Sequence, residues 1–293
     1  MSFLDFQNLF GPAGVWVAGA VLAAVGILIA AAFVQNREIA VWRIRIGTRT
    51  PQTVAAGERV RRTSGGQEDT PPYDEIFEAD RATAFYGRIA AVYDRRNSED
   101  LGATHLAGIT RVQDRLALTG HLRVLDLGGG TGNPIATHFF DNRAIEWTYV
   151  DACPVLARIF RRSLETHPLG RRMSIETGDL NVAVRRLPRG GYDVILLSLV
   201  LTSMPRLPDF ADIARLLAPH GSLIVSDIGP GYTQLKPYYE VDVGGQLLAL
   251  RTVAVDPLDV SRKAVAAGLV MTELTALGDD DPYYSFIATF AKP

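Results

Sequence analysis

The spacing of hydrophobic and polar positions changes several times along this chain, and each change predicts a different kind of element. Residues 11–34 contain no charged side chain. Residues 47–80 show little periodicity and are rich in Thr, Gly, Pro, Arg and acidic residues, which is typical of a flexible linker. Two stretches then carry apolar residues at helical spacing, 81–97 and about 105–118.

The remainder of the chain alternates short apolar runs with helical patterns, which predicts an α/β fold with a doubly wound, mostly parallel sheet. The expected strands are about 122–127, 145–150, 173–177, 192–198, 219–226, 270–276 and 283–291. Residues 240–255 have strand character around Gly244-Gly245, as in a hairpin. Asp256-Pro257 forms an N-cap and N1 pair for a helix that ends near Ala267.

The first of these strands leads into a glycine cluster, in the sequence Leu-Arg-Val-Leu-Asp-Leu-Gly-Gly-Gly-Thr-Gly-Asn that ends at Asn133. Glycines at such a strand-to-helix turn take positive φ angles and allow a ligand to approach the main chain. A dinucleotide-binding loop requires Gly-x-Gly-x-x-Gly. Counted from Gly128, Asn133 stands in place of the third glycine, so that pattern fails. A glycine-rich turn without a ligand is the simpler alternative.

The pattern that is present, Asp-x-Gly-x-Gly-x-Gly from Asp126 to Gly132, resembles motif I of the class I S-adenosylmethionine (SAM) methyltransferases. The resemblance covers about 81–293 and implies a Rossmann-like, seven-stranded, mostly parallel sheet with an antiparallel C-terminal strand. Dinucleotide domains lack that terminal strand pair. The resemblance implies SAM as cofactor. The candidate cofactor residues are Asp126, Gly128, Gly129, Gly130, Gly132, Asp151, Ala152, Asp179, Leu180, Ser198 and Tyr93.

Several of these residues have expected roles. Asp151 ends the second strand, where a carboxylate can accept hydrogen bonds from both ribose hydroxyls; it also suits an N-cap. In this family an acidic residue after the third strand contacts the adenine amino group, which matches Asp179. Ser198 leaves the fourth strand near the expected sulfonium. Val92-Tyr-Asp-Arg-Arg-Asn97 resembles the lid segment of small-molecule and quinone C-methyltransferases, so Tyr93 either closes over the cofactor or packs on an amphipathic helix.

The acceptor side offers weaker signals. Residues 227–240 follow the fifth strand and should overhang the pocket. A general base is needed only if the nucleophile arrives protonated. The candidates, each also interpretable as structural, are Asp227, Tyr232, Tyr238 and His105. Metal-dependent O-methyltransferases place an aspartate after the fourth strand, where this chain has Ser198-Leu-Val, so no metal is expected. No Asn/Asp-Pro-Pro-Tyr motif indicates an amino or nucleobase acceptor.

The uncharged run 11–34, about 24 residues, would span roughly 36 Å as a helix, enough to cross a bilayer core. Asp5 is the only charge before Gly11, which favours a transmembrane anchor over a cleaved signal peptide. Arginines follow the run closely, so the positive-inside rule predicts a single-pass protein whose catalytic domain is cytoplasmic. The expected organisation is an anchor and juxtamembrane segment (1–46), a linker (47–80), and a methyltransferase domain (81–293) with a helical cap (81–120).

Net charge and cysteine content limit the expected partners and the expected cellular compartment. A net charge of −2 gives no reason to expect nucleic acid. The single cysteine, Cys153, excludes an intrachain disulfide and fits a reducing compartment. The predicted function is methyl transfer from SAM to a small, lipophilic or membrane-associated acceptor. The alternatives are an NAD(P)-dependent oxidoreductase and a catalytically inactive SAM-binding domain that serves as a membrane-tethered partner.

Overall fold

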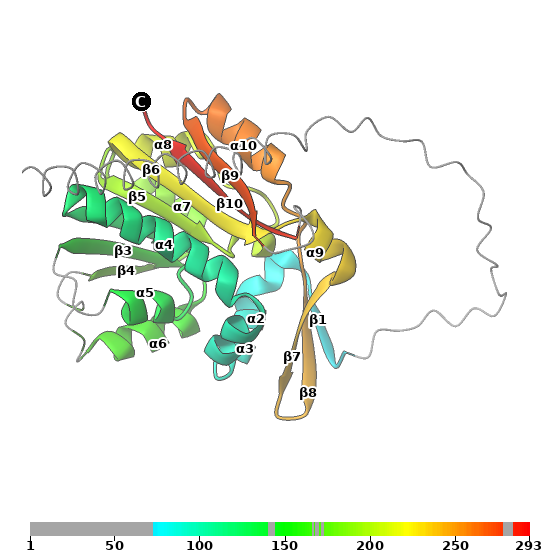
Figure 1. The fold of residues 1–293 in the computed structure, drawn as a ribbon. Coiled ribbons are helices and arrows are strands. Elements are labelled where there is room, and N and C mark those ends of the chain that lie inside the picture. The colour runs from blue at the N-terminus through cyan, green and yellow to red at the C-terminus, as the bar shows by residue number, and fades with distance from the viewer. Residues whose placement is uncertain (1–72, 140–143, 166, 168–169, 171–172, 278–283) are drawn as a thin grey trace, which may run out of the picture. The chain divides into compact units, whose positions relative to one another are not determined.

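A seven-stranded sheet in the order β4-β3-β2-β5-β6-β10-β9 forms the centre of the fold (Figure 1). The computed structural model describes residues 73–293 except 140–143, 166, 168–169, 171–172 and 278–283. The first five strands are parallel, and β10 is antiparallel to both of its neighbours. This arrangement confirms the predicted sheet. Its strands are β2 (Leu122–Leu127), β3 (Ile145–Asp151), β4 (Met173–Thr177), β5 (Tyr192–Ser198), β6 (Leu217–Ile228), β9 (Val270–Leu277) and β10 (Ser285–Ala291).

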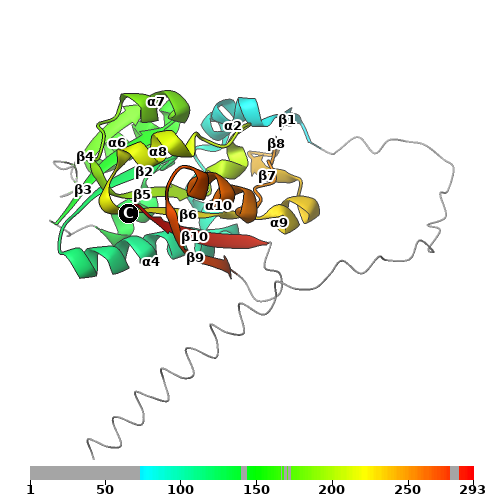
Figure 2. The same ribbon diagram turned by 90° about the horizontal axis from the view of Figure 1, so that it is seen from above.

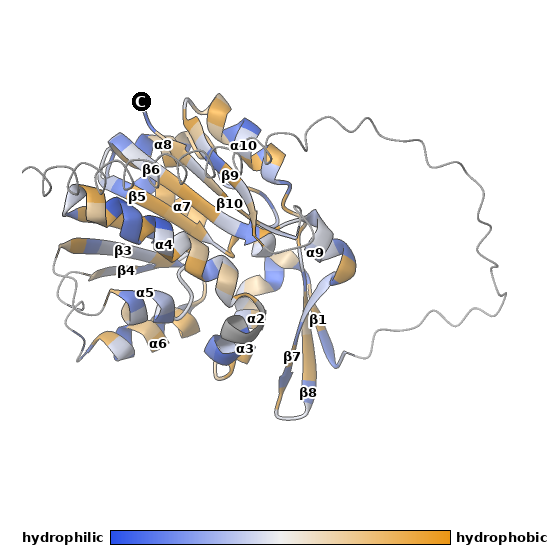
Figure 3. Cartoon of the chain, in the orientation of Figure 1, coloured by the Kyte–Doolittle hydropathy of each residue, from blue (hydrophilic) through white to orange (hydrophobic). Residues whose placement is uncertain are grey.

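Helices cover both faces of this sheet (Figure 2). On one face lie α4 (Gly102–Thr119), α5 (Asn133–His138) and α6 (Pro154–Leu164). On the other face lie α7 (Leu180–Arg186), α8 (Phe210–Leu216) and α10 (Pro257–Ala266). Because successive strand residues point to opposite faces, the inner strands contribute to both cores; Tyr149 of β3 packs with the first set and Val150 with the second. The hydrophobic strands are correspondingly enclosed between amphipathic helices (Figure 3).

A small second sheet, β1-β8-β7, adjoins the carboxyl end of the large one. Its strands are β1 (Glu75–Phe77), β7 (Tyr238–Val243) and β8 (Gln246–Arg251), and the short helix α9 (Pro230–Leu235) precedes β7. β7 and β8 form the hairpin predicted around Gly244-Gly245, both of which have positive φ. β1 lies within the stretch expected to be linker and pairs in parallel with β8. The small sheet buries its apolar face against Phe85 and Ile89 of α2 (Ala82–Ile89).

The single helix expected over 81–97 is two helices, α2 and α3 (Tyr93–Asp100). The helix is interrupted because its two halves pack against different parts of the structure. α2 buries Phe85 and Ile89 in the core of the small sheet. α3 is polar, and it turns towards the glycine loop, where Thr131 donates a hydrogen bond to the carboxylate of Asp94.

The predicted localisation, a single-pass membrane protein with a cytoplasmic catalytic domain, is contradicted by the helices of the structure. Among the described residues, no helix combines the length and apolar composition needed to cross a bilayer. The longest of them, α4, has 18 residues but carries Arg111, Asp114 and Arg115. The run 11–34, on which the prediction rested, lies outside the described residues.

Candidate functional site

The carboxyl ends of β2, β3, β4 and β5 meet at one edge of the sheet, and polar side chains gather there. Asp126, Asp151 and Ser198 belong to β2, β3 and β5, and all three are buried. Asp179 follows β4 and caps α7, accepting a hydrogen bond of 3.0 Å from the amide of Val182. The fold therefore brings together four residues that lie up to 72 positions apart in sequence.

A cavity of about 380 Å³ lies beside these strand ends. Of the predicted cofactor residues, it is lined by Gly128, Asp151, Ala152, Asp179 and Leu180. Further lining comes from residues that the sequence did not single out, among them Thr83, Tyr86, Val200 and Ser203. We call this space the strand-end cavity.

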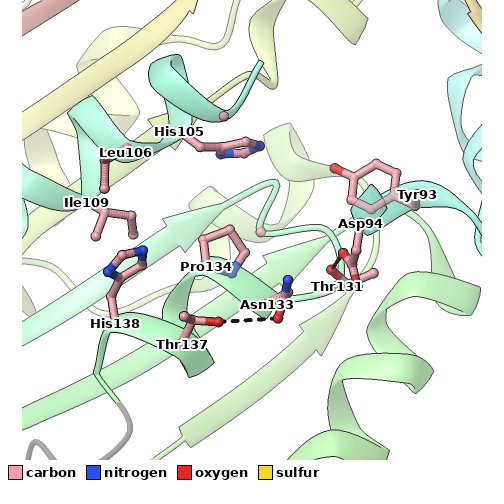
Figure 4. A pocket seen from close by; sticks show the side chains of 12 residues that line it. Tyr93, Asp94, His105, Leu106, Ile109, Thr131, Asn133, Pro134, Thr137 and His138 are labelled. Atoms are coloured by element: carbon pink, nitrogen blue, oxygen red, sulfur yellow. Dashed lines mark hydrogen bonds between the residues drawn. The ribbon is translucent and has the colours of Figure 1, made fainter. Parts of the chain in front are cut away.

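A second cavity of about 300 Å³ lies between α3, α4 and α5 (Figure 4). Tyr93 and His105 extend towards it from α3 and α4, and Gly129 and Thr131 of the glycine loop form part of its wall. Gly128 lines the strand-end cavity instead, so the glycine loop separates the two spaces. We call this second space the helix cavity.

A smaller space adjoins the helix cavity and is lined in part by residues of β2 and β5. A space of about 20 Å³, enough for about one water molecule, is lined by His105, Asp126, Gly129 and Ser198. Asp126 has no hydrogen-bond partner among the described residues. Burial, assisted by the nearby charge of Asp151, raises the pKa of the Asp126 carboxyl to about 7. A buried carboxyl that reaches a cavity without a partner is suited to a cationic or hydrogen-bond-donating ligand.

Asp151 is hydrogen-bonded through both oxygens. Oδ2 accepts from the amide of Gly130 at 2.9 Å, and Oδ1 accepts from the amide of Cys153 at 2.7 Å. Burial raises the pKa of Asp151 to about 6, although these two amides act in the opposite direction. Each carboxylate oxygen has a second lone pair, so these bonds leave acceptor capacity towards the strand-end cavity.

His105 belongs to a chain of buried hydrogen bonds. Its Nδ1 lies 2.9 Å from Ser198 Oγ, to which Ser226 Oγ donates at 3.1 Å. Burial lowers the pKa of His105 to about 4, so the imidazole is neutral at pH 7. A neutral imidazole that lines a cavity can accept a proton from a bound molecule.

A family model described as "Methyltransferase domain" matches residues 90–251, which is more than half of the chain. This chain belongs to that family. SAM is the cofactor of this methyltransferase. The alternative of an NAD(P)-dependent oxidoreductase is therefore rejected. The structure fits that cofactor, because buried carboxyls suited to ribose hydroxyls and to an ammonium group reach the cavities on either side of the glycine loop.

Two relatives share the name ubiquinone/menaquinone biosynthesis C-methyltransferase UbiE. The protein of Dinoroseobacter shibae is 28% identical over 182 residues, covering 58% of this chain and 71% of the relative. That of Paracoccus denitrificans is 30% identical over 157 residues, covering 51% and 61%.

The similar solved structures include the [4+2]-cyclase SpnF, with a TM-score of 0.55 and 19% identity over 75% of this chain and 98% of that one. Another is a putative methyltransferase in complex with the Haloferax volcanii Trm112 methyltransferase activator, with a TM-score of 0.51 and 15% identity over 72% and 97%. At these identities the likeness shows the fold alone.

A third space in the methyltransferase lies between α2, α3 and the small sheet. It measures about 30 Å³ and is bordered by four tyrosines, Tyr86, Tyr93, Tyr232 and Tyr239. The rest of its lining is apolar or hydroxylated: Leu101, Leu199, Thr202, Ser203, Ile228, Leu250 and Thr252. We call it the tyrosine cavity. None of the described residues that line it carries a charge.

The tyrosine cavity and the strand-end cavity share a wall. Tyr86 and Ser203 line both spaces, and the Tyr86 hydroxyl lies 2.7 Å from Ser203 Oγ. Burial raises the pKa of Tyr86 to about 12, so its hydroxyl stays protonated at neutral pH. No local pattern in the sequence indicates this wall, because Tyr86 lies on an amphipathic helix, α2, where an aromatic residue is ordinary.

The acceptor-side candidates occupy different places. Asp227 is fully buried, and its carboxylate accepts hydrogen bonds of 2.8 Å from the amides of Leu201 and Ile228. It thereby holds the loop after β5, and burial raises its pKa to about 7. Tyr232 lines the tyrosine cavity. The ring of Tyr238 packs at 5.3 Å against Tyr73 and lines none of the three cavities.

Within the described part of the chain, no cluster of three or more His, Cys, Asp or Glu side chains is arranged to hold a metal ion. Of the buried carboxyls, Asp126 and Asp151 lie at the glycine loop, whereas Asp227 accepts hydrogen bonds from backbone amides after β5 and at the end of β6.

Proposed function

We propose that this chain transfers the methyl group of SAM to a small, uncharged, lipophilic acceptor held in the tyrosine cavity. The observation that carries this proposal is the wall of Tyr86 and Ser203, which the strand-end cavity and the tyrosine cavity share. Methyl transfer is an in-line displacement, so the donor and the acceptor must lie on either side of one short gap. At this shared wall, a donor in the strand-end cavity and an acceptor in the tyrosine cavity would lie close to each other.

The proposed cofactor residues follow from the two cavities that flank the glycine loop. Asp151 would bind the ribose hydroxyls, and Asp179 with the backbone of Leu180 would bind adenine in the strand-end cavity. The helix cavity would take the amino-acid end, with Asp126 available to its ammonium group. When bound, SAM supplies an electrophilic methyl group on a sulfonium. Of the remaining predicted residues, five line these spaces: Gly128, Gly129, Ala152, Ser198 and Tyr93. Gly130 and Gly132 line none of them and would act by shaping the loop, since both have positive φ.

The lining of the tyrosine cavity favours a planar, uncharged acceptor. Aromatic rings bury large apolar surfaces of a ligand, and the hydroxyls of Thr202, Ser203 and Thr252 provide hydrogen bonds for an oxygen substituent. A charged acceptor would be desolvated there without an opposite charge. A space of about 30 Å³ has room for about one water molecule, so Tyr86 and its neighbours must move when an acceptor enters.

The name that the two relatives share supports a more specific acceptor, a carbon atom of a quinone precursor. The nucleophile would be the reduced, quinol form: a hydroxyl proton leaves as the ring carbon takes the methyl group and S-adenosylhomocysteine departs. Loss of the hydrogen on that carbon and return of a proton to the oxygen then restore the aromatic quinol. His105 is neutral at pH 7, but it lines the helix cavity and not the tyrosine cavity, so it would not reach an acceptor held in the tyrosine cavity. Tyr232 remains a candidate for orienting the acceptor oxygen.

Mass spectrometry of reactions with the full chain tests this proposal. The purified protein is incubated with SAM and short-chain demethylated naphthoquinols or benzoquinols under reducing conditions. The expected product is heavier by one methylene unit and carries the new methyl group on a ring carbon. Methylation of charged soluble amines or carboxylates instead of the quinols would contradict the proposed acceptor class. Binding of SAM without turnover of any acceptor would favour the catalytically inactive alternative.

A further inference from the structure

Tyr149 lies directly below the glycine loop and contacts its backbone. Side chains two residues apart on a strand point to the same face, so Tyr149 and Asp151 of β3 both reach the loop. The Tyr149 hydroxyl donates a hydrogen bond to the carbonyl oxygen of Gly130, whose own amide donates to Asp151 Oδ2 at 2.9 Å. Both polar backbone groups of Gly130 are thus bound by side chains of the neighbouring strand.

The ring of Tyr149 has no room to move. It is fully buried and packs 4.9 Å from the ring of Phe160. A Cβ atom added at Gly129 would lie 2.6 Å from two ring carbons of Tyr149, and one added at Gly132 would lie 2.2 Å from the ring of Phe160. These two glycines are therefore required by the aromatic rings beneath the loop, and not solely by a ligand above it.

The Tyr149 hydroxyl keeps its proton and can donate a hydrogen bond at any physiological pH. Burial raises its pKa, so the group stays protonated throughout the physiological range. Its removal would leave the Gly130 carbonyl buried and without this partner, and a buried backbone acceptor without a partner favours rearrangement of its peptide. Gly130 has a φ of +59°, a left-handed conformation in which the direction of the peptide depends on what holds it.

We propose that Tyr149 is a positioning residue for the cofactor: by binding the Gly130 carbonyl it orients the loop segment that lines the helix cavity. Gly129 and Thr131, on either side of Gly130, form part of that wall. The inference rests on the proposed function in one respect, the placement of the amino-acid end of SAM in the helix cavity. It is independent of the acceptor.

Calorimetric titration of the full-length Tyr149→Phe variant tests the inference without any acceptor. The substitution keeps the ring that supports Gly129 and removes only the hydroxyl. Two ligands are compared: S-adenosylhomocysteine, and 5′-methylthioadenosine, which lacks the amino-acid end. We expect binding of S-adenosylhomocysteine to weaken about tenfold, equivalent to about 1.4 kcal/mol, and binding of 5′-methylthioadenosine to change less than about twofold.

Tyr192→Phe is the matched control. Tyr192 is also a buried tyrosine of the large sheet, with its hydroxyl bonded to Thr148, but it starts β5 at the end away from the site. Its replacement should leave the affinities for both ligands unchanged. Urea unfolding of the ligand-free variants shows whether the two substitutions cost similar stability.

The outcomes separate the inference from the proposed function. Unchanged binding of S-adenosylhomocysteine by Tyr149→Phe would overturn the inference, as would equal losses for both ligands, which indicate general loosening. Wild-type protein that binds S-adenosylhomocysteine but methylates no quinol would contradict the proposed acceptor and leave the Tyr149 result valid. Wild-type protein that binds neither adenosyl ligand would overturn both.

Discussion

The proposed cofactor side and the proposed acceptor side of the site are built from different kinds of structural elements. The cofactor side uses the ends of parallel strands that neighbour one another, and three of its residues, Asp126, Asp151 and Asp179, each stand at or just beyond a strand end. The proposed acceptor side is the tyrosine cavity, which is lined by residues of α2, α3, the loops after β5 and β6, α9 and the small sheet. A strand end is marked in the local sequence, whereas a cavity between separate elements is not.

The two sides also differ in charge. The cofactor side buries two carboxyls with raised pKa values, one of them without a hydrogen-bond partner in the described part of the chain. Such groups destabilise the ligand-free protein and gain partners when a ligand binds. The described lining of the tyrosine cavity is uncharged, so acceptor selection depends on shape, aromatic contact and hydroxyl groups. Three substitutions test whether this division holds.

The largest effect is expected from Asp151→Ala. The variant loses a carboxylate that holds Gly130 and Cys153 and that faces the strand-end cavity. We expect S-adenosylhomocysteine to bind about 100-fold more weakly, measured by calorimetry. Asp193→Ala is the control, since Asp193 pairs with Arg123 at 2.9 Å near the other end of β5. Equal losses in both variants would mean that the strand-end carboxylate has no special role.

An intermediate effect is expected from Tyr86→Phe, which removes the hydrogen bond to Ser203 and keeps the ring. The KM for the acceptor quinol should rise about fivefold because the wall loses its hydroxyl contact, while the affinity for S-adenosylhomocysteine changes less than about twofold. Tyr238→Phe, outside the three cavities, should alter neither value. A loss of cofactor affinity in Tyr86→Phe equal to its loss of acceptor affinity would erase the distinction between the two sides.

The last prediction concerns pH and Asp126. Because burial raises the folded-state pKa of Asp126 from the ordinary aspartate value of 3.8 to about 7, the folded protein retains a proton between these values that the unfolded chain has released. The stability of the ligand-free protein should therefore fall as pH rises through this window. Asp151 and Asp227 contribute in the same direction, and His105, with its lowered pKa, in the opposite one.

Asp126→Asn isolates this contribution. Urea unfolding at pH 5 and pH 8 should show a loss of stability in wild type that exceeds the loss in the variant by about 1–2 kcal/mol. Binding of S-adenosylhomocysteine, which carries an ammonium group, should strengthen from pH 6 to pH 8 in wild type and much less in the variant. Identical pH profiles for the two proteins would show that Asp126 does not titrate in this range.

Much of the cofactor side could be predicted from the chain because its signals are local. An apolar run that ends in Asp-x-Gly-x-Gly-x-Gly, and later runs that end in Asp151 and Asp179, mark strand ends without reference to the rest of the fold. In a parallel sheet such ends converge by geometry. The predicted helix over 81–97 was wrong as one element, because local periodicity does not reveal that α2 and α3 pack on different surfaces.

By itself, then, the sequence determined the parallel sheet, the glycine loop and the carboxyls that surround it, since these depend on side-chain period and turn chemistry. Only the tertiary structure decided which hydroxyls matter. Tyr86 meets Ser203 across 117 positions, and Tyr149 meets Gly130 across 19. In the sequence each of these tyrosines is one aromatic residue among many, because the partner that gives its hydroxyl a role is supplied by packing between separate elements.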